Sequence, residues 1–277
     1  MKKHTVILLL LLSTTLTFAQ KKDKIKGSKT VTVEQREVGN FESLEVEDNI
    51  EVHLERGEKT ELKVEADDNL HDIISVDLRD KILRIYTTKE AVSSKKIIVR
   101  VTYTKDLNLI ISKNESTVNA IQEIQLDNLT FKAYDFSQLY LNVNAKNFIL
   151  QADDKSKTEL NLKSENTIIE LSKNASLKAL ATTVDLKVDM YQKSTATIEG
   201  DATNASIRLD NNSALTASKF TVKNADVTTE SYSNCSLNAT VTVIIDAAEK
   251  SEIQLLGTPK IEIRKFADEA KLFKKLK

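Results

Sequence analysis

Two stretches of the sequence, MYQKSTATI at 190–198 and LDNNSALTA at 209–217, follow one pattern although few of their residues are the same. In each stretch polar residues precede a serine, and small or apolar residues follow that serine two and four positions later. The serines are Ser194 and Ser213, which lie 19 residues apart. Such a spacing indicates a structural repeat.

The same position recurs along most of the chain, and we call its occupants the anchor residues. The steps between successive anchors are 21, 19, 19, 19, 19, 20 and 18 residues. The anchors are Ser116, Ser137, Ser156, Ala175, Ser194, Ser213, Ser233 and Ser251. Apolar residues prevail two and four positions after an anchor and four and six positions before it, whereas the positions between them are mostly polar. A period of two on both sides of a small residue predicts two short strands that meet at a tight bend, with alternate side chains facing inward.

A unit of about 19 residues is too short to enclose a core by itself, but stacked units bury a continuous core. Helical repeats need about 33 residues or more, and a leucine-rich repeat or a hexapeptide helix would show its own signature. We therefore predict an all-β fold, a single-stranded, right-handed parallel β-helix (a β-solenoid) with about 19 residues per rung. The anchor position should accept only small side chains, because the bend leaves little room there.

The rest of the chain is predicted to extend this solenoid as one domain over residues 38–277. Residues 38–104 alternate without the repeat and are interpreted as opening strands that cap the first rung. Residues 105–265 form the repeated rungs, and residues 20–37 are interpreted as a charged, mobile lead. The segment FADEAKLFKKLK at 266–277 is predicted to be a cap, either a tail or a short helix over the last rung.

The helical reading of this last segment rests on Phe266, Ala270 and Phe273, which share one face at helical spacing, with lysines elsewhere. A basic helix lying on a membrane surface is the alternative. Both readings place an amphipathic element at the end of the solenoid.

The beginning of the chain reads as a secretory signal peptide at 1–19, with lysines, an apolar run and a small-residue cleavage site ending at Ala19. The only cysteine is Cys235, so no disulfide framework is expected, and the thiol is predicted to lie in the core. Without Lys2 and Lys3, 38 basic residues face 41 acidic ones, a net charge of −3. That balance gives no reason to expect nucleic acid as a partner.

No catalytic, cofactor-binding or metal-binding residue is predicted. His53 and His71 lie outside the repeat, and neither zinc-ligand spacing, nor a Ser/His/Asp arrangement, nor a glycine-rich phosphate loop is present. Stacked carboxylates are the remaining route to an enzyme. Asp210 and Glu230 should lie about 5 Å apart on adjacent rungs, where they could serve as acid and nucleophile. Acidic residues are also common in turns, which is the structural explanation.

A binding surface is the other route to function. Tyr134 and Tyr191 occupy the same position relative to their anchors and should lie three rungs apart, about 14 Å. Aromatic faces suit sugar rings, although tryptophan is absent and aromatic residues make up only 5% of the chain. Tyr134, Tyr191, Asp210 and Glu230 are therefore the candidate ligand surface, with ordinary exposed side chains as the alternative.

The chain resembles the family named "putative auto-transporter adhesin, head GIN domain", which is common in exported proteins of Bacteroidetes. The resemblance rests on NFESLEVEDNIEVHLERGEKTELKVEADDNLHDIISVDLRDKILRIY at 40–86, on IIVRVTYTKDLNLIISKNESTVNA at 97–120, and on the serine-anchored repeats. It implies a parallel β-helix of the cell envelope and carries no catalytic residues. The chain departs from the family in having few glycines at its turns, where Asn and Lys stand instead.

We therefore expect a non-enzymatic, exported binding or adhesion module of the cell envelope, located in the periplasm, on the cell surface or outside the cell. Its partner is unidentified, with a glycan or a surface protein as the two candidates, and it needs no cofactor. One alternative is a polysaccharide-active lyase or hydrolase that uses stacked carboxylates. The other is a structural component of the envelope.

Overall fold

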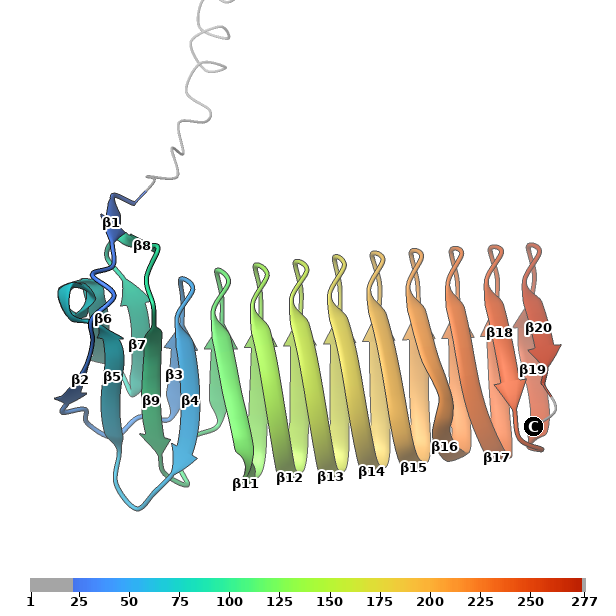
Figure 1. The fold of residues 1–277 in the computed structure, drawn as a ribbon. Helices are drawn as coiled ribbons and strands as arrows, with labels where there is room; N and C mark the ends of the chain where they lie inside the picture. Colours follow the sequence, from blue (N-terminus) through green and yellow to red (C-terminus); the bar gives the residue numbers. More distant parts are fainter. Residues whose placement is uncertain (1–21, 276–277) are drawn as a thin grey trace, which may run out of the picture.

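The computed structural model describes residues 22–275, which form a parallel β-solenoid of about nine turns with about 19 residues per rung (Figure 1). The predicted solenoid is confirmed. The predicted signal peptide, residues 1–19, lies outside the described residues.

Seven long strands build the regular part of the solenoid. They are β11 (Thr117–Ala133), β12 (Gln138–Ala152), β13 (Lys157–Leu171), β14 (Ser176–Met190), β15 (Thr195–Leu209), β16 (Ala214–Thr229) and β17 (Asn234–Ala247). Each pairs in parallel with the next, one rung further on. Each strand bends midway, so that its two halves lie in opposite layers (Figure 1). We call the layer of first halves sheet A and the layer of second halves sheet B.

The core lies between the two sheets. In β12 alternate side chains are buried, with Leu139, Leu141 and Val143 coming from sheet A. Phe148 and Leu150 come from sheet B and meet them. Because each rung repeats this arrangement, the apolar side chains form continuous columns, and their removal from water stabilises the stack at about 25 cal/mol per Å².

The anchor residues occupy the inner corner of a tight turn, as predicted. All eight have no exposed surface. The two residues before each anchor adopt left-handed backbone conformations, for example Gln192 with φ 54° and Lys193 with φ 63° before Ser194. The turn closes when the anchor N–H donates to the residue three positions earlier, as Ser137 does to the Tyr134 carbonyl at 3.0 Å. These are two-residue turns of the type that joins strands tightly.

The turns also bond to one another along the solenoid. The N–H of Phe136 donates to the carbonyl of Asp154 on the next rung at 3.0 Å, and the N–H of Lys155 donates to the carbonyl of Lys173 at 3.1 Å. This explains why Phe and Glu, as well as the Asn and Lys noted in the sequence, stand at left-handed positions. The hydrogen bonds between rungs offset the strain of a left-handed non-glycine residue.

The predicted opening strands are present before the first long strand. They are β3 (Ser43–Val46), β4 (Glu51–Arg56), β5 (Glu61–Asp67), β6 (Ile74–Arg79), β7 (Ile82–Thr87), β8 (Glu90–Val92), β9 (Ile97–Tyr103) and β10 (Leu109–Ser112). Sheet B continues from β11 through β10, β3 and β7, and ends with antiparallel β6. Sheet A continues through β4 and β9 to antiparallel β5. The 3-10 helix η1 (Asp68–Ile73) buries Leu70 and Ile73 at this end.

The prediction of a mobile lead over residues 20–37 is wrong for the part that the structure describes. Strand β1 (Lys24–Lys26) pairs in parallel with β8, and β2 (Val31–Arg36) pairs antiparallel with β5. The edge of β5 would otherwise leave its backbone groups unpaired, and β2 satisfies them. Sheet A therefore ends with β2.

The predicted C-terminal helix is also wrong. The chain continues as β18 (Glu252–Leu256), β19 (Lys260–Phe266) and β20 (Lys271–Lys274), and β20 pairs in parallel with β18. Ala270 follows two left-handed residues and is a ninth anchor, 19 residues after Ser251. Pairing with the preceding rung gives more of the backbone N–H and C=O groups hydrogen-bond partners than a short isolated helix would. None of the helices among residues 22–275 is long and apolar enough to cross a membrane.

Candidate binding surfaces

The two predicted tyrosines lie where the repeat places them. Tyr134 and Tyr191 each precede a turn. Their N–H groups donate to the backbone carbonyls of Ser112 and Leu171, respectively, on the preceding rung, at 2.9 and 3.0 Å. They therefore share one column, three rungs apart. Tyr134 is half-buried, and Tyr191 is 43% exposed.

An ion pair occupies the column between the two tyrosines. Asp153, one rung after Tyr134, accepts a hydrogen bond from Lys173 at 2.9 Å. Burial raises the pKa of the Asp153 carboxyl, but the bonds from Lys173 and from the Asp154 N–H outweigh it and hold this pKa low. Burial, with a smaller effect of the Asp153 charge, raises the pKa of the Tyr134 phenol. The two tyrosines thus do not form a continuous aromatic strip, and their role in binding stays a prediction.

The predicted carboxylates, Asp210 and Glu230, occupy this column on adjacent rungs. Asp210 accepts a hydrogen bond from the N–H of Asn211 at 2.7 Å, which supports its own turn. Glu230 lies 3.7 Å from the ammonium of Lys265. Within residues 22–275 no group of three or more His, Cys, Asp or Glu side chains is placed to hold a metal ion. Both acids have local structural partners, and a chemical role for them stays a prediction.

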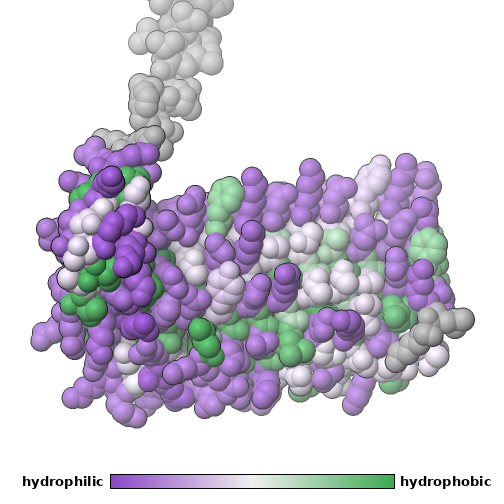
Figure 2. Space-filling view, viewed as in Figure 1, coloured by the Kyte–Doolittle hydropathy of each residue, from purple (hydrophilic) through white to green (hydrophobic). Residues whose placement is uncertain are grey.

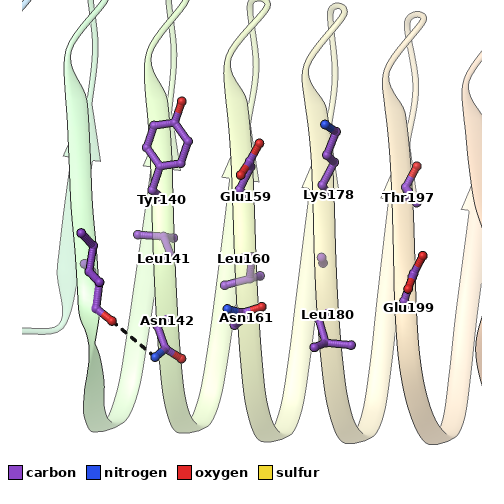
Figure 3. Close-up of a pocket in the computed structure, with 13 residues that line it drawn as sticks. Tyr140, Leu141, Asn142, Glu159, Leu160, Asn161, Lys178, Leu180, Thr197 and Glu199 are labelled. Carbon is purple, nitrogen blue, oxygen red and sulfur yellow. Dashed lines mark hydrogen bonds between the residues drawn. The ribbon is translucent and has the colours of Figure 1, made fainter.

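A hollow on the outside of sheet A gathers a different set of side chains (Figure 3). It has a volume of about 550 Å³ and crosses successive rungs. We call it the sheet A hollow. Its lining includes Ile121, Tyr140, Asn142, Glu159, Asn161, Lys178, Leu180, Thr197 and Glu199. These residues could not be predicted from the sequence, because they face outward and follow no pattern of their own.

Two apolar side chains flank two polar ones across the sheet A hollow. Ile121 is 79% exposed and Leu180 is 56% exposed, and the amides of Asn142 and Asn161 lie on the rungs between them. Figure 2 shows a long face of the solenoid, on which hydrophobic side chains lie among hydrophilic ones. The Asn142 amide donates to the Ile121 carbonyl at 3.5 Å (Figure 3), and the Asn161 amide has no partner among the described residues. Exposed aliphatic groups beside these amides offer both contact area and hydrogen bonds to a bound molecule.

Two charged side chains in the sheet A hollow, Glu159 and Lys178, have no partner among the described residues, whereas a third, Glu199, pairs with Lys219 at 3.1 Å. Glu159 and Lys178 stand opposite each other on neighbouring strands. Among the described residues no hydrogen bond or ion pair joins them to each other or to another side chain. Tyr140, one rung earlier, donates from its hydroxyl to the side chain of Gln138 at 3.1 Å. A carboxylate and an ammonium are therefore available to a ligand here.

A ladder of amides, which was also not predicted, runs along the outside of sheet B. Asn147 donates to Asn128 at 2.7 Å, and Asn166 donates to Asn147 at 2.9 Å. Further along, Asn204 donates to Asp185 at 2.8 Å. The recurrence of Asn at the solenoid spacing was a signal that could have found it. Because its members bond to one another, this column stabilises the stack.

A further sequence prediction concerns Cys235. Cys235 lies in the core, as predicted, and burial raises the pKa of its thiol to about 12. A thiol held in its neutral form is a poor nucleophile, so Cys235 acts as a small apolar side chain.

Solved structures with the same fold come from species of Parabacteroides. One, described as a putative adhesin from Parabacteroides merdae, is 17% identical, covers 91% of this chain and 100% of its own, and has a TM-score of 0.65. Another, described as a putative lipid binding protein from Parabacteroides distasonis, is 14% identical over 91% of this chain and 100% of its own, with a TM-score of 0.65. A third, described as a putative adhesin from Parabacteroides distasonis, is 17% identical over the same shares, with a TM-score of 0.64.

Among curated proteins, none matches the chain. A family comparison does give a match. The profile of the family "Putative auto-transporter adhesin, head GIN domain" matches residues 40–184 and 157–259, which together span most of the chain. The protein therefore belongs to the putative auto-transporter adhesin, head GIN domain family.

Proposed function

We propose that this protein is a non-enzymatic, exported binding or adhesion module that holds a glycan on the outside of its solenoid. Membership of an adhesin-like family supports a binding role, and the predicted signal peptide supports export. The observation that carries the proposal is the sheet A hollow, in which a tyrosine, two asparagine amides and the unpaired charges of Glu159 and Lys178 lie together.

The chemistry of the sheet A hollow suits a sugar chain. Tyr140 presents an aromatic ring that is 40% exposed, on which the apolar face of a pyranose can pack. Asn142 and Asn161 can donate to and accept from hydroxyl groups, and Glu159 can accept from them. A volume of about 550 Å³ falls within the range of ligand sites. Because sheet A is regular, neighbouring sugar units would meet successive rungs.

A glycan array with the purified protein tests this proposal. We expect binding to a subset of glycans, with Tyr140→Ala and Asn161→Ala each weakening the affinity at least tenfold, about 1.4 kcal/mol. Tyr191→Ala is the matched control, since this tyrosine has a similar exposure but stands outside the hollow.

Two results would contradict the proposal. If the protein bound no glycan across a broad array, glycans would be excluded as its ligands. Binding that survives Tyr140→Ala but is lost with Tyr191→Ala would move the site from the sheet A hollow to the column of Tyr134 and Tyr191.

A further inference from the structure

The two ends of sheet A differ, and its outer strand at the N-terminal end carries charged groups on the core side. At this end β2 is the outer strand of sheet A. Glu34 lies opposite the buried Val64, and Arg36 lies opposite the buried Leu62, so both charged side chains are on the core side of β2. Opposed residues of an antiparallel pair face the same side.

Hydrogen bonds fix this polar layer over the end of the core. Arg36 donates to the carbonyl of His71 at 2.8 Å and also pairs with Glu34 at 3.2 Å. The His71 side chain contacts the hydroxyl of Thr32 at 2.9 Å. Charged side chains that point inward on an edge strand are a known way to prevent another strand from adding to it. The edge of sheet A at the N-terminal end is therefore protected.

The C-terminal end has an apolar layer instead. Ile261 and Ile263 of β19 pair with Val243 and Ile245 of β17, which are core residues with almost no exposed surface. Ile261, Ile263 and Phe266 thus continue core columns, yet they are 39%, 50% and 44% exposed. No further rung among residues 22–275 covers them, because β19 and β20 are the last strands of the stack (Figure 1).

The backbone is also unpaired at this end. Strand β19 is the outer strand of sheet B, and β20 is the outer strand of sheet A. Each turn in the stack donates a backbone hydrogen bond to the next turn. The last of these bonds runs from the N–H of Lys250 to the carbonyl of Asp268 at 2.8 Å. Free edges beside exposed apolar side chains are a template for adding strands. A lipid surface would not satisfy these backbone groups.

We propose that the C-terminal end docks against the same end of a second copy of this chain, through a two-fold axis. Two identical ends present edge strands at identical spacing, so one rotation pairs β19 with β19 and β20 with β20 and joins the apolar layers. The N-terminal end of another copy does not fit sheet A, because the polar layer of its β2 would oppose Leu272 of β20, which continues the core column of Ile253. A two-fold contact is closed and leaves no apolar end for further growth.

The charges at the C-terminal end are compatible with this contact. Arg264 forms hydrogen bonds with both Asp226 and Asp246, the shortest of them 2.6 Å. Lys271 pairs with Glu252 at 2.8 Å. These carboxylates of the preceding rungs reduce repulsion between two basic ends. The contact is small, because only one rung of each copy takes part, so we expect micromolar affinity.

Sedimentation velocity on the purified protein between about 2 and 200 µM tests the proposal. We expect a reversible monomer–dimer equilibrium, with Ile263→Lys raising the dissociation constant at least tenfold. Phe266→Glu should do the same and serves as the second variant. Val33→Lys is the matched control, since Val33 is 67% exposed on β2 at the opposite end, and it should leave the dimer intact.

Circular dichroism on each variant separates loss of the dimer from loss of the fold. A protein that stays monomeric at about 200 µM overturns the proposal, and flotation of that monomer with phosphatidylglycerol vesicles would assign the end to lipid. A dimer that survives both Ile263→Lys and Phe266→Glu also overturns it, because the interface then lies elsewhere. The proposal is independent of glycan binding.

Discussion

The anchor residues allow a prediction that separates their size from their hydroxyl groups. Ser194 and Ser213 are both fully buried on adjacent rungs. The Ser213 hydroxyl donates to the carbonyl of Met190 at 3.1 Å, whereas the Ser194 hydroxyl has no hydrogen-bond partner. Ala175 occupies the same position one rung before Ser194, so alanine is known to fit.

Because of these contacts, we expect two similar substitutions to change the free energy of unfolding in different directions. Ser194→Ala removes a buried hydroxyl without a partner, a defect that costs about 1–3 kcal/mol, so the free energy of unfolding should stay equal or rise. Ser213→Ala should lower it by about 0.5–1.5 kcal/mol, because a hydrogen bond is lost. The loss should lie at the low end of this range, since the Met190 carbonyl keeps a second hydrogen bond, from the Asp210 N–H at 2.9 Å.

Ser194→Leu tests the size of the corner itself. Leucine is larger than serine, and neighbouring rungs about 4.8 Å away leave no space for it. We expect a loss of about 1–3 kcal/mol or more from overpacking. Urea unfolding followed by circular dichroism measures all three variants against the parent protein. Equal destabilisation by Ser194→Ala and Ser213→Ala, or a Ser194→Leu variant as stable as the parent, would refute the reasoning.

Two further predictions concern polar groups outside the anchor column. Asp185→Asn should raise the free energy of unfolding by about 0.5–1.5 kcal/mol, because an amide can donate to Asn166 and continue the ladder that a carboxylate interrupts; thermal unfolding at neutral pH checks this, and a lower midpoint would contradict it. Asp67 is fully buried and accepts hydrogen bonds from the N–H groups of Lys29, Lys95 and Lys96 at 3.0, 3.1 and 3.3 Å. Burial raises the pKa of the Asp67 carboxyl, but these bonds outweigh it, so the folded pKa lies below the usual 3.8. Its contribution to stability is therefore complete above the unfolded pKa and is lost as the pH falls through the folded one. Asp67→Asn should destabilise the protein by about 1–3 kcal/mol at pH 7 and flatten the acid limb of urea midpoints recorded against pH; an unchanged limb would argue against this role.

The repeated rungs could be predicted because each rung tests the same rule again. A small anchor, two inward alternations and a polar turn recur together, and few other folds explain that combination. Ala270 was missed as a ninth anchor for a definite reason. The residue four positions later is Lys274 where an apolar residue stands in other rungs, and Phe266, Ala270 and Phe273 also fit a helical face. Only pairing with β18 decides between the two structures.

Strand β2 could not be predicted from periodicity. It pairs with β5, so that Val31 lies opposite Asp67 in a distant part of the sequence. Such a pairing is set by which edge remains open after the other strands have formed, and a local pattern does not record it. The sheet A hollow was missed for a similar reason. Its lining comes from outward positions of several rungs, where solvent accepts many residue types.

The outward columns nevertheless differ in a way that indicates function. Stacking places each outward side chain about 4.8 Å from its counterparts on the neighbouring rungs, so a column of like amides can satisfy itself. The ladder through Asn128, Asn147 and Asn166 does so and gains nothing from a ligand. In the sheet A hollow, Glu159 and Lys178 are unlike neighbours that do not bond to each other. A ligand with hydroxyl groups can form there the hydrogen bonds that the chain does not supply, which makes the hollow, and not the ladder, the surface to test for binding.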